Sequence, residues 1–109
     1  MGLKMKLWID DVRPAPEGYR WCKTVNSAIQ FIETHEALYC NGDVKETIEL
    51  IDLDHDAGDY VCNGGDYIRI LDWLEFTNRN YPIRIHSMNP VGRENMRRII
   101  QKNGWTEVM

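Results

Sequence analysis

The chain has 109 residues, of which 43% are hydrophobic and 28% charged, as is typical of one soluble globular domain with a single core. Its formal net charge of −4 argues against a long basic surface for nucleic acid, and no apolar run approaches the roughly 20 residues that cross a bilayer. Three widely spaced cysteines, Cys22, Cys40 and Cys62, and an N-terminus without a signal-peptide pattern predict a reduced, cytoplasmic protein without a disulfide framework.

The chain begins with a predicted strand that ends in two acidic residues. Residues 5–9 alternate and then become apolar before Asp10 and Asp11, which is typical of a strand whose charged end leaves the sheet. Two prolines and a glycine within residues 12–18 exclude a regular helix there. We therefore expect a shaped loop between the first two strands.

A second strand and a first helix come next. Residues 19–24 are rich in strand formers, and Thr24 or Asn26 can cap the helix that follows. Apolar residues at helical spacing continue this helix to near Leu38. The helix therefore connects the second strand to the third.

The third strand, residues 48–54, ends in a dense group of ionisable residues. Its apolar first part runs directly into Asp54, His55 and Asp56. An unpaired ionised group costs several kcal/mol inside a protein, so these side chains are expected to emerge at the carboxyl end of the strand. Ligands bind at that end of open α/β sheets, and we therefore expect the floor of an active site here.

The second half of the chain predicts two more helices around a fourth strand. An irregular loop, a helix, the fourth strand and a short last strand are expected over residues 59–65, 65–78, 82–86 and 105–109, respectively. Asn89 as N-cap and Pro90 as the first helical residue predict the start of the last helix, which stops at Gly104.

This order of elements predicts a small α/β domain. Helices between successive strands favour a parallel sheet with right-handed crossovers. The chain contains no repeat, no low-complexity segment and no linker. We therefore expect residues 1–109 to form a single domain with an open, mainly parallel sheet flanked by helices.

In such a sheet, three strand ends deliver ionisable residues to one edge. These residues are Asp10 and Asp11, Asp54 to Asp56, and His86 with Ser87. Repulsion among the carboxylates would raise one or more of their pKa values unless a proton or a cation intervenes. Mg²⁺ prefers oxygen ligands, so Asp10, Asp11 and Asp54 are candidate ligands for this ion.

The two histidines at this edge suggest acid–base chemistry. His55 and His86 leave neighbouring strand ends, and two imidazoles can serve as general base and general acid on opposite sides of a phosphate. Asp54 and Asp56 would orient the rings and hold the useful tautomers. The sequence leaves open which histidine takes which role.

Four further residues are candidates for holding a phosphate. Ser87, Asn89 and the free N–H groups at the start of the last helix indicate an anion site. Arg13 and Arg93 can add bidentate contacts to phosphate oxygens. A simpler interpretation of Arg13 is that it pairs with a local carboxylate.

Several other residues have structural interpretations. Asp52 is expected to be structural or to support the neighbouring acids, and His35, at a polar helix end, is expected to be incidental. The cysteines have no partner base in their sequence context and are expected to be packing residues.

Three segments of the chain carry a family resemblance. They are Leu7 to Pro16, Leu53 to Asp56 and Ile85 to Asn95, of which the His-Ser-Met-Asn-Pro run is the most specific. These segments resemble the cyclic-phosphate-processing receiver-like domains, an offshoot of the response-regulator receiver fold. The resemblance covers nearly the whole chain and implies a receiver-like, flavodoxin-like fold that processes cyclic phosphates, such as nucleotide or RNA 2′,3′-cyclic ends.

The resemblance also implies roles for individual residues. Asp10 and Asp11 match the acid pair that helps receivers bind Mg²⁺, Asp54 matches the phospho-accepting aspartate, and Ser87 matches the switch Ser/Thr. Three departures count against phosphorelay signalling. A Pro-rich loop replaces the first receiver helix, no lysine follows the last strand, and the final helix is missing.

The leading hypothesis is a phosphoesterase that processes cyclic phosphates by two-histidine acid–base catalysis. Its partner would be a phosphate-containing small molecule or an RNA end. The alternative is a non-enzymatic, degenerate receiver domain that binds a phosphorylated ligand or a protein partner. A third hypothesis is a toxin, antitoxin or phage accessory protein with a vestigial pocket. The sequence does not predict the oligomeric state.

Overall fold

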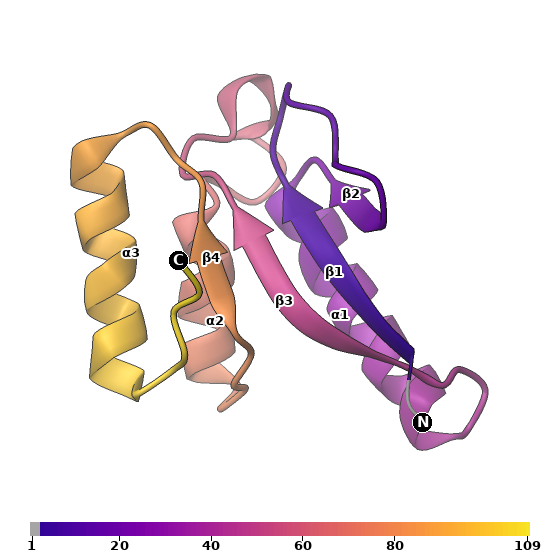
Figure 1. Cartoon of the computed structure of the whole chain (residues 1–109). Coiled ribbons are helices and arrows are strands. Elements are labelled where there is room, and N and C mark those ends of the chain that lie inside the picture. Colours follow the sequence, from indigo (N-terminus) through magenta and orange to yellow (C-terminus); the bar gives the residue numbers. More distant parts are fainter. Residues whose placement is uncertain (1–2) are drawn as a thin grey trace.

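The computed structural model describes residues 3–109 as an α/β fold. Its elements follow the chain as β1 Leu3–Ile9, β2 Tyr19–Cys22, α1 Val25–Cys40, β3 Glu46–Leu53, the 3₁₀ helix η1 Gly58–Tyr60, α2 Ile68–Phe76, β4 Ile83–Ile85 and α3 Pro90–Asn103 (Figure 1). The predicted order of strands and helices is confirmed, including the loop that replaces a helix between β1 and β2. No helix among the described residues is long and apolar enough to cross a membrane.

Several predicted segments are shorter than expected: the second and fourth strands, predicted over residues 19–24 and 82–86, span Tyr19–Cys22 and Ile83–Ile85, and the helix over 65–78 and the last strand differ most. The helix predicted over residues 65–78 spans only Ile68–Phe76, because Gly65 and Asn78 adopt positive φ angles of 96° and 57° that a helix cannot accommodate. The short last strand is reduced to a single bridge between Ile83 and Glu107. Neither of the last two differences alters the strand ends at which the candidate site residues lie.

The four strands form one parallel sheet in the order β2-β1-β3-β4. Parallel strands end at the same edge, so the carboxyl ends of β1, β3 and β4 lie together, as predicted. The register places Trp8 of β1 opposite both Trp21 of β2 and Asp52 of β3, and Asp52 opposite Arg84 of β4. Residues paired in this way project from the same face of the sheet.

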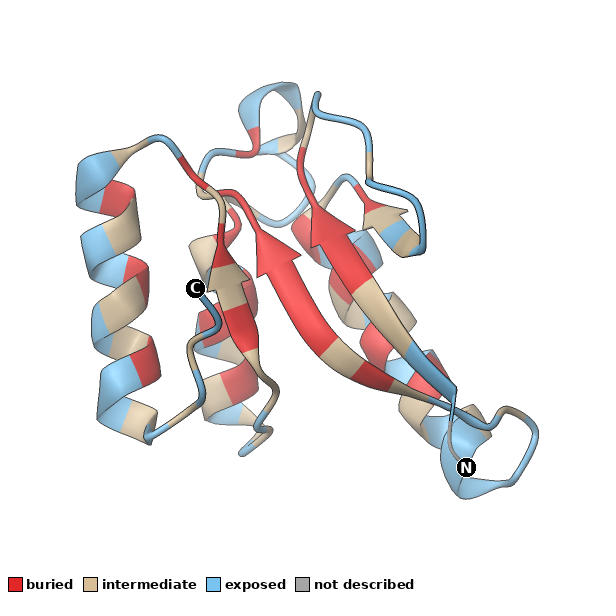
Figure 2. Ribbon diagram, in the orientation of Figure 1, coloured by how far each residue is buried: buried red, intermediate tan, exposed pale blue. Residues whose placement is uncertain are grey.

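The hydrophobic core lies between the sheet and the helices (Figure 2). Alternate strand residues face it, among them the fully buried Leu7, Ile9, Ile51 and Leu53. The helices contribute apolar stripes, which include Ile32, Ile70, Leu71, Leu74, Met96 and Ile100.

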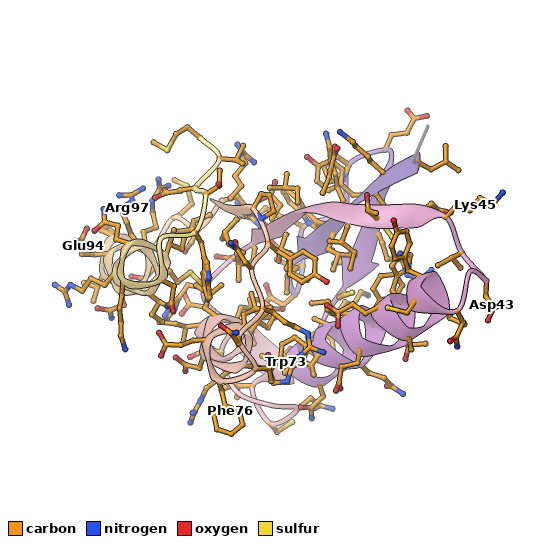
Figure 3. The ribbon with its side chains drawn as sticks, turned by 90° about the horizontal axis from the view of Figure 1, so that it is seen from below. Asp43, Lys45, Trp73, Phe76, Glu94 and Arg97 are labelled. Atoms are coloured by element: carbon orange, nitrogen blue, oxygen red, sulfur yellow. The ribbon has the colours of Figure 1, made fainter. Side chains whose placement is uncertain are left out.

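The opposite face of the sheet carries no helix among residues 3–109. In Figure 3, α1 and α2 lie below the sheet, α3 lies next to α2, and no helix lies above the sheet. The connections β2-α1-β3 and β3-α2-β4 step across the sheet in the same direction, so right-handed crossovers put their helices on the same side. The β1–β2 connection, which steps the other way, is a loop. This arrangement leaves alternate strand residues on a face without helices.

The last helix begins as the sequence predicts. The Asn89 side chain accepts a hydrogen bond from the backbone N–H of Gly92 at 3.0 Å, Pro90 is the first helical residue, and Gly104 ends the helix with a φ of 68°. The start of α3 is therefore fixed next to the strand ends.

Candidate active site

His86 is held between two buried carboxylates at the end of β4. Its Nε2 lies 2.8 Å from Oδ2 of Asp10, and its Nδ1 lies 2.7 Å from Oδ1 of Asp52. Ionised carboxylates only accept hydrogen bonds, so an imidazole that donates to both carries a proton on each nitrogen. Asp10 and Asp52 are fully buried, and only 6% of the His86 side chain is exposed. The ring therefore has one fixed orientation.

Trp8 fixes the plane of the same ring. The Trp8 and His86 rings are stacked, with centroids 3.8 Å apart and planes only 2° from parallel. The indole N–H donates to the backbone carbonyl of Arg13 at 2.9 Å, so the indole is itself anchored. An aromatic face attracts a cationic ring, which stabilises His86 in the form that donates to both acids.

Asp10 accepts hydrogen bonds from two backbone N–H groups and lies beside the His86 ring. Its Oδ1 accepts from the backbone N–H groups of Val12 and Arg13 at 3.0 and 2.9 Å. Burial alone would raise the pKa of Asp10, but the hydrogen bonds from Arg13, His86 and Val12 outweigh it, so the pKa lies below its usual value. Asp10 is therefore a fixed negative charge.

Arg13 bridges two carboxylates of the site. Its Nε lies 3.3 Å from Oδ2 of Asp10, and its Nη2 lies 3.3 Å from Oδ2 of Asp54. This geometry matches the local ion pair that the sequence left as an alternative to phosphate binding. The other oxygen of Asp54 accepts from the backbone N–H of His55 at 2.7 Å.

The predicted Mg²⁺ ligands are only partly assembled. Asp10, Asp54 and His86 place potential ligand atoms within 4.8 Å of one another, whereas Asp11 lies outside this group. Burial raises the pKa of Asp11, as do the nearby charges of Asp10 and Asp54. The Arg13 guanidinium already contacts Oδ2 of both Asp10 and Asp54, so these carboxylates have a cationic partner within the chain.

His55 lies in a second cluster next to the start of α3. Its Nδ1 is 2.8 Å from Oδ1 of Asp56, whose Oδ2 lies 3.4 Å from the amide nitrogen of Asn89. A Cβ added to Gly92 would collide with the His55 ring, which shows how closely the ring packs on the first turn of α3. His55, Asp56 and Asp66 form a second group whose ligand atoms lie within 4.8 Å of one another. Asp54 links the two histidine clusters, since it contacts the His55 backbone and belongs to the His86 group.

The predicted phosphate-binding residues have different surroundings. The Ser87 hydroxyl is fully buried and accepts from the backbone N–H of Asn89 at 3.0 Å, so it stabilises the turn before α3. Arg93 donates from Nη1 to the carbonyl of Ser87 at 3.1 Å. Arg93 also lines a hollow of about 260 Å³ together with His86 and Arg84.

Sequence reasoning missed Trp8 and Arg84, and it expected Asp52 only to be structural or to support the neighbouring acids. Trp8 stacks on His86, Asp52 accepts from it, and Arg84 pairs with Asp52 at 2.9 Å. Arg84 could have been found from the alternation of side chains along β4, which puts Arg84 and His86 on the same face of the sheet. The expectation that His35 is incidental is wrong, because its buried ring lies 2.6 Å from the carbonyl of Glu46 and ties α1 to β3.

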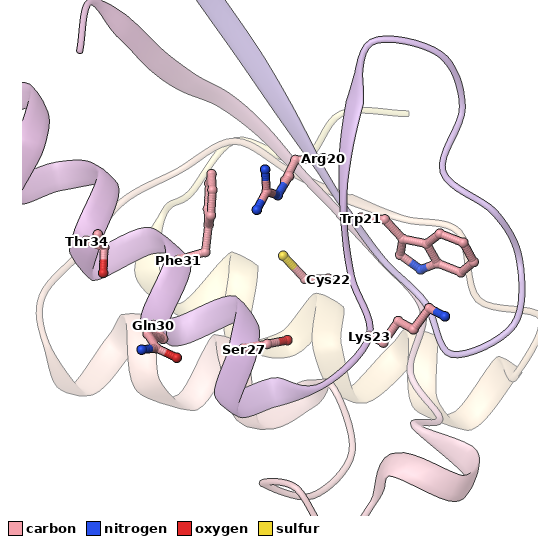
Figure 4. A pocket seen from close by; sticks show the side chains of 8 residues that line it. All are labelled: Arg20, Trp21, Cys22, Lys23, Ser27, Gln30, Phe31 and Thr34. Carbon is pink, nitrogen blue, oxygen red and sulfur yellow. The ribbon is translucent and has the colours of Figure 1, made fainter.

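Another hollow lies between β2 and α1, next to Cys22, Phe31 and Arg20 (Figure 4). Burial raises the pKa of the Cys22 thiol to about 11, against a smaller opposing effect of Arg20. A thiol of this kind is a poor nucleophile, which agrees with the expected packing role of Cys22. The hollow includes neither His55 nor His86.

Comparison with known proteins gives one match. A family model described as cyclic-phosphate processing receiver domain matches residues 5–102. No curated protein and no solved structure matches the chain.

The buried acid at the centre of the site predicts a pH-dependent loss of stability in Asp10→Asn. The substitution should lower the free energy of unfolding by about 3 kcal/mol at neutral pH, because it removes one of the two carboxylate partners of both His86 and Arg13. The folded-state pKa of Asp10 is depressed, so its contribution is complete above the unfolded pKa of about 3.9 and disappears as the pH falls through the lower folded value. Urea unfolding across this pH range measures the effect. Asp43→Asn, at an exposed turn, is the control, and an equal loss in both variants would contradict the assignment.

The close packing of His55 on α3 predicts that Gly92→Ala destabilises the protein. Alanine normally stabilises a helix interior relative to glycine by about 1 kcal/mol, whereas the collision with His55 should cost about 1–3 kcal/mol. Thermal unfolding of Gly92→Ala, alone and combined with His55→Ala, separates the two effects. The double variant should recover the lost stability, and a stabilised single variant would show that the ring lies elsewhere.

Proposed function

We propose that this chain, which belongs to the cyclic-phosphate processing receiver domain family, is a phosphoesterase that opens cyclic phosphates by acid–base catalysis. One observation carries the proposal most directly. Both ring nitrogens of His86 contact buried carboxylates, and the ring lines a hollow that it shares with Arg84 and Arg93. A proton donor beside two guanidinium groups suits a phosphate that must release an oxygen.

The two arginines would hold the phosphate. Arg84 uses Nη1 to pair with Asp52, and Arg93 uses Nη1 to donate to the Ser87 carbonyl, so each keeps further N–H donors for a ligand. Guanidinium groups match the spacing of phosphate oxygens and stabilise the charge that develops on them. The proposed phosphate ligands are therefore Arg84 and Arg93, of which only Arg93 was predicted from the sequence. Arg13 instead pairs with Asp10 and Asp54.

His55 is the better candidate for the general base. Its Nδ1 contacts Asp56, and Nε2 has no hydrogen-bond partner among residues 3–109. An imidazole that donates from Nδ1 to a carboxylate leaves Nε2 as a proton acceptor, and the carboxylate stabilises the cation that forms. The first turn of α3 connects the two clusters, since Gly92 packs on His55 and Arg93 lines the hollow beside His86.

The proposed step hydrolyses one bond of the cyclic phosphate. His55 takes a proton from a water molecule, and the water oxygen forms a new bond to phosphorus. The bond between phosphorus and one ribose oxygen breaks, and that oxygen takes a proton from His86, replacing one of the two carboxylates as the acceptor of that ring N–H. The product is a phosphomonoester beside a free hydroxyl. Transfer of a proton back from His55 to His86, through solvent, restores both histidines.

The buried acids act by positioning. Asp10 and Asp52 hold the His86 ring, and Trp8 sets its plane. Asp10 and Asp54 are already paired with Arg13, and the proposed step does not use a metal ion. If Mg²⁺ binds, these carboxylates would hold it, and it would supply additional positive charge.

The test is hydrolysis of uridine and adenosine 2′,3′-cyclic monophosphates, followed by ³¹P NMR with and without EDTA. His86→Gln and His55→Gln should each lower kcat by about 100-fold or more, the usual contribution of a general acid or base. His35→Gln, checked for folding, is the matched control and should keep the wild-type rate.

Undiminished hydrolysis in both active-site variants would refute the two-histidine mechanism. If the folded wild-type protein binds inorganic phosphate without hydrolysing any cyclic phosphate, the alternative of a non-enzymatic phosphate-binding receiver domain replaces the proposal.

A further inference from the structure

We infer that the helix-free face of the sheet binds a single RNA strand, so that the substrate is an RNA end rather than a free cyclic nucleotide. The inference rests on the proposed function, because it places the cyclic end of that strand at His86. The residues that define this face, called here the open face, are Lys4, Lys6, Trp8, Tyr19, Trp21, Leu50, Asp52 and Arg84.

Strand register brings these residues together. Lys6 lies opposite Tyr19 on one side and Leu50 on the other, and Trp8 lies opposite both Trp21 and Asp52. Their neighbours along β1, Leu7 and Ile9, face the core. The open face therefore runs from β2 across β1 and β3 to Arg84 of β4.

Aromatic rings lead across this face to the candidate active site. Tyr19 meets Trp8 edge to face with centroids 5.8 Å apart, and Trp8 stacks on His86. Trp21 lies beside Trp8 with the Lys23 ammonium 4.5 Å from its ring centre. Tyr19 and Trp21 are partly exposed. Proteins that bind single-stranded nucleic acid use such rings to stack bases and nearby cations to hold the backbone.

The charge of the open face differs from that of the whole chain. The formal net charge is −4, yet Lys4, Lys6 and Arg84 have side chains that are 68%, 41% and 42% exposed on this face. The acid between the two lysines, Glu49, is 3.9 and 3.8 Å from their amines, which are long contacts. The lysine ammonium groups therefore retain N–H donors that can bind the phosphate groups of an RNA strand.

The same features disfavour an apolar protein segment as the occupant. Leu50 and Trp8, the large apolar groups in the middle of the face, are only 7% and 9% exposed. The accessible side chains are three cations, the acid Glu49 and the partly exposed rings of Tyr19 and Trp21, and the cations outnumber the acid. The face also continues directly into the hollow that contains His86 and Arg84.

The experiment compares an oligouridine RNA ending in a 2′,3′-cyclic phosphate with uridine 2′,3′-cyclic monophosphate. The wild-type protein should have a kcat/KM at least about tenfold higher for the RNA, since stacking and phosphate contacts add to binding. Lys6→Glu and Tyr19→Ala should remove most of this advantage while leaving the rate on the mononucleotide unchanged. Lys4→Glu, at the exposed start of β1, provides a variant less prone to affect folding. Arg69→Glu, exposed on α2 on the helix side, makes the same charge change and should have no effect.

A second measurement is independent of catalysis. Fluorescence anisotropy of the same RNA carrying a 5′ label should show binding that weakens with salt, with a log–log slope of about −0.7 for each phosphate contact, and Lys6→Glu should reduce this slope by about one contact. Equal kcat/KM for RNA and mononucleotide, or RNA affinity unaffected by Lys4→Glu and Lys6→Glu, would overturn the inference and leave the proposed hydrolysis intact. Salt-dependent RNA binding through these lysines without hydrolysis of either substrate would instead support the open face and refute the proposed catalysis.

Discussion

The contact of His86 with Asp10 and Asp52 is the interaction on which the site depends. It joins the end of β4 to β1 and β3, and the ring it fixes stacks on Trp8. Two buried carboxylates next to each other would repel unless a cation lay between them. The His86 ring lies between Asp10 and Asp52, Arg13 supplies a cation between Asp10 and Asp54, and Arg84 pairs with Asp52. The acidic floor is therefore balanced by side chains of the chain itself.

The helix-free face and the site have a common origin. A loop connects β1 to β2, and no helix follows α3 in the described chain, so the sheet has helices on one side. On the other side lie Trp8, Asp52 and Arg84, each the last residue but one of its strand and close to His86.

The sequence predicted the fold and the strand ends because both follow from local patterns. Apolar runs before Asp10, Asp54 and His86 place these residues at one edge of any parallel sheet, and the structure brings all three together. Asp52 was expected only to be structural or to support the neighbouring acids. The roles of Trp8 and Arg84 were missed because their partners, His86 and Asp52, come from other parts of the chain. The distribution of His55 and His86 into separate clusters depends on how the chain turns after β3, where Gly58 adopts a positive φ. No local pattern specifies the direction of that turn.

The state of the His86 ring tests this account most directly. Long-range ¹H–¹⁵N NMR spectra of the three histidine rings can be recorded with and without inorganic phosphate. The account predicts a hydrogen on both nitrogens of His86, signals of His86 and His55 that shift as phosphate binds, and signals of His35 that stay in place. A bare nitrogen on His86 together with no response to phosphate would contradict it.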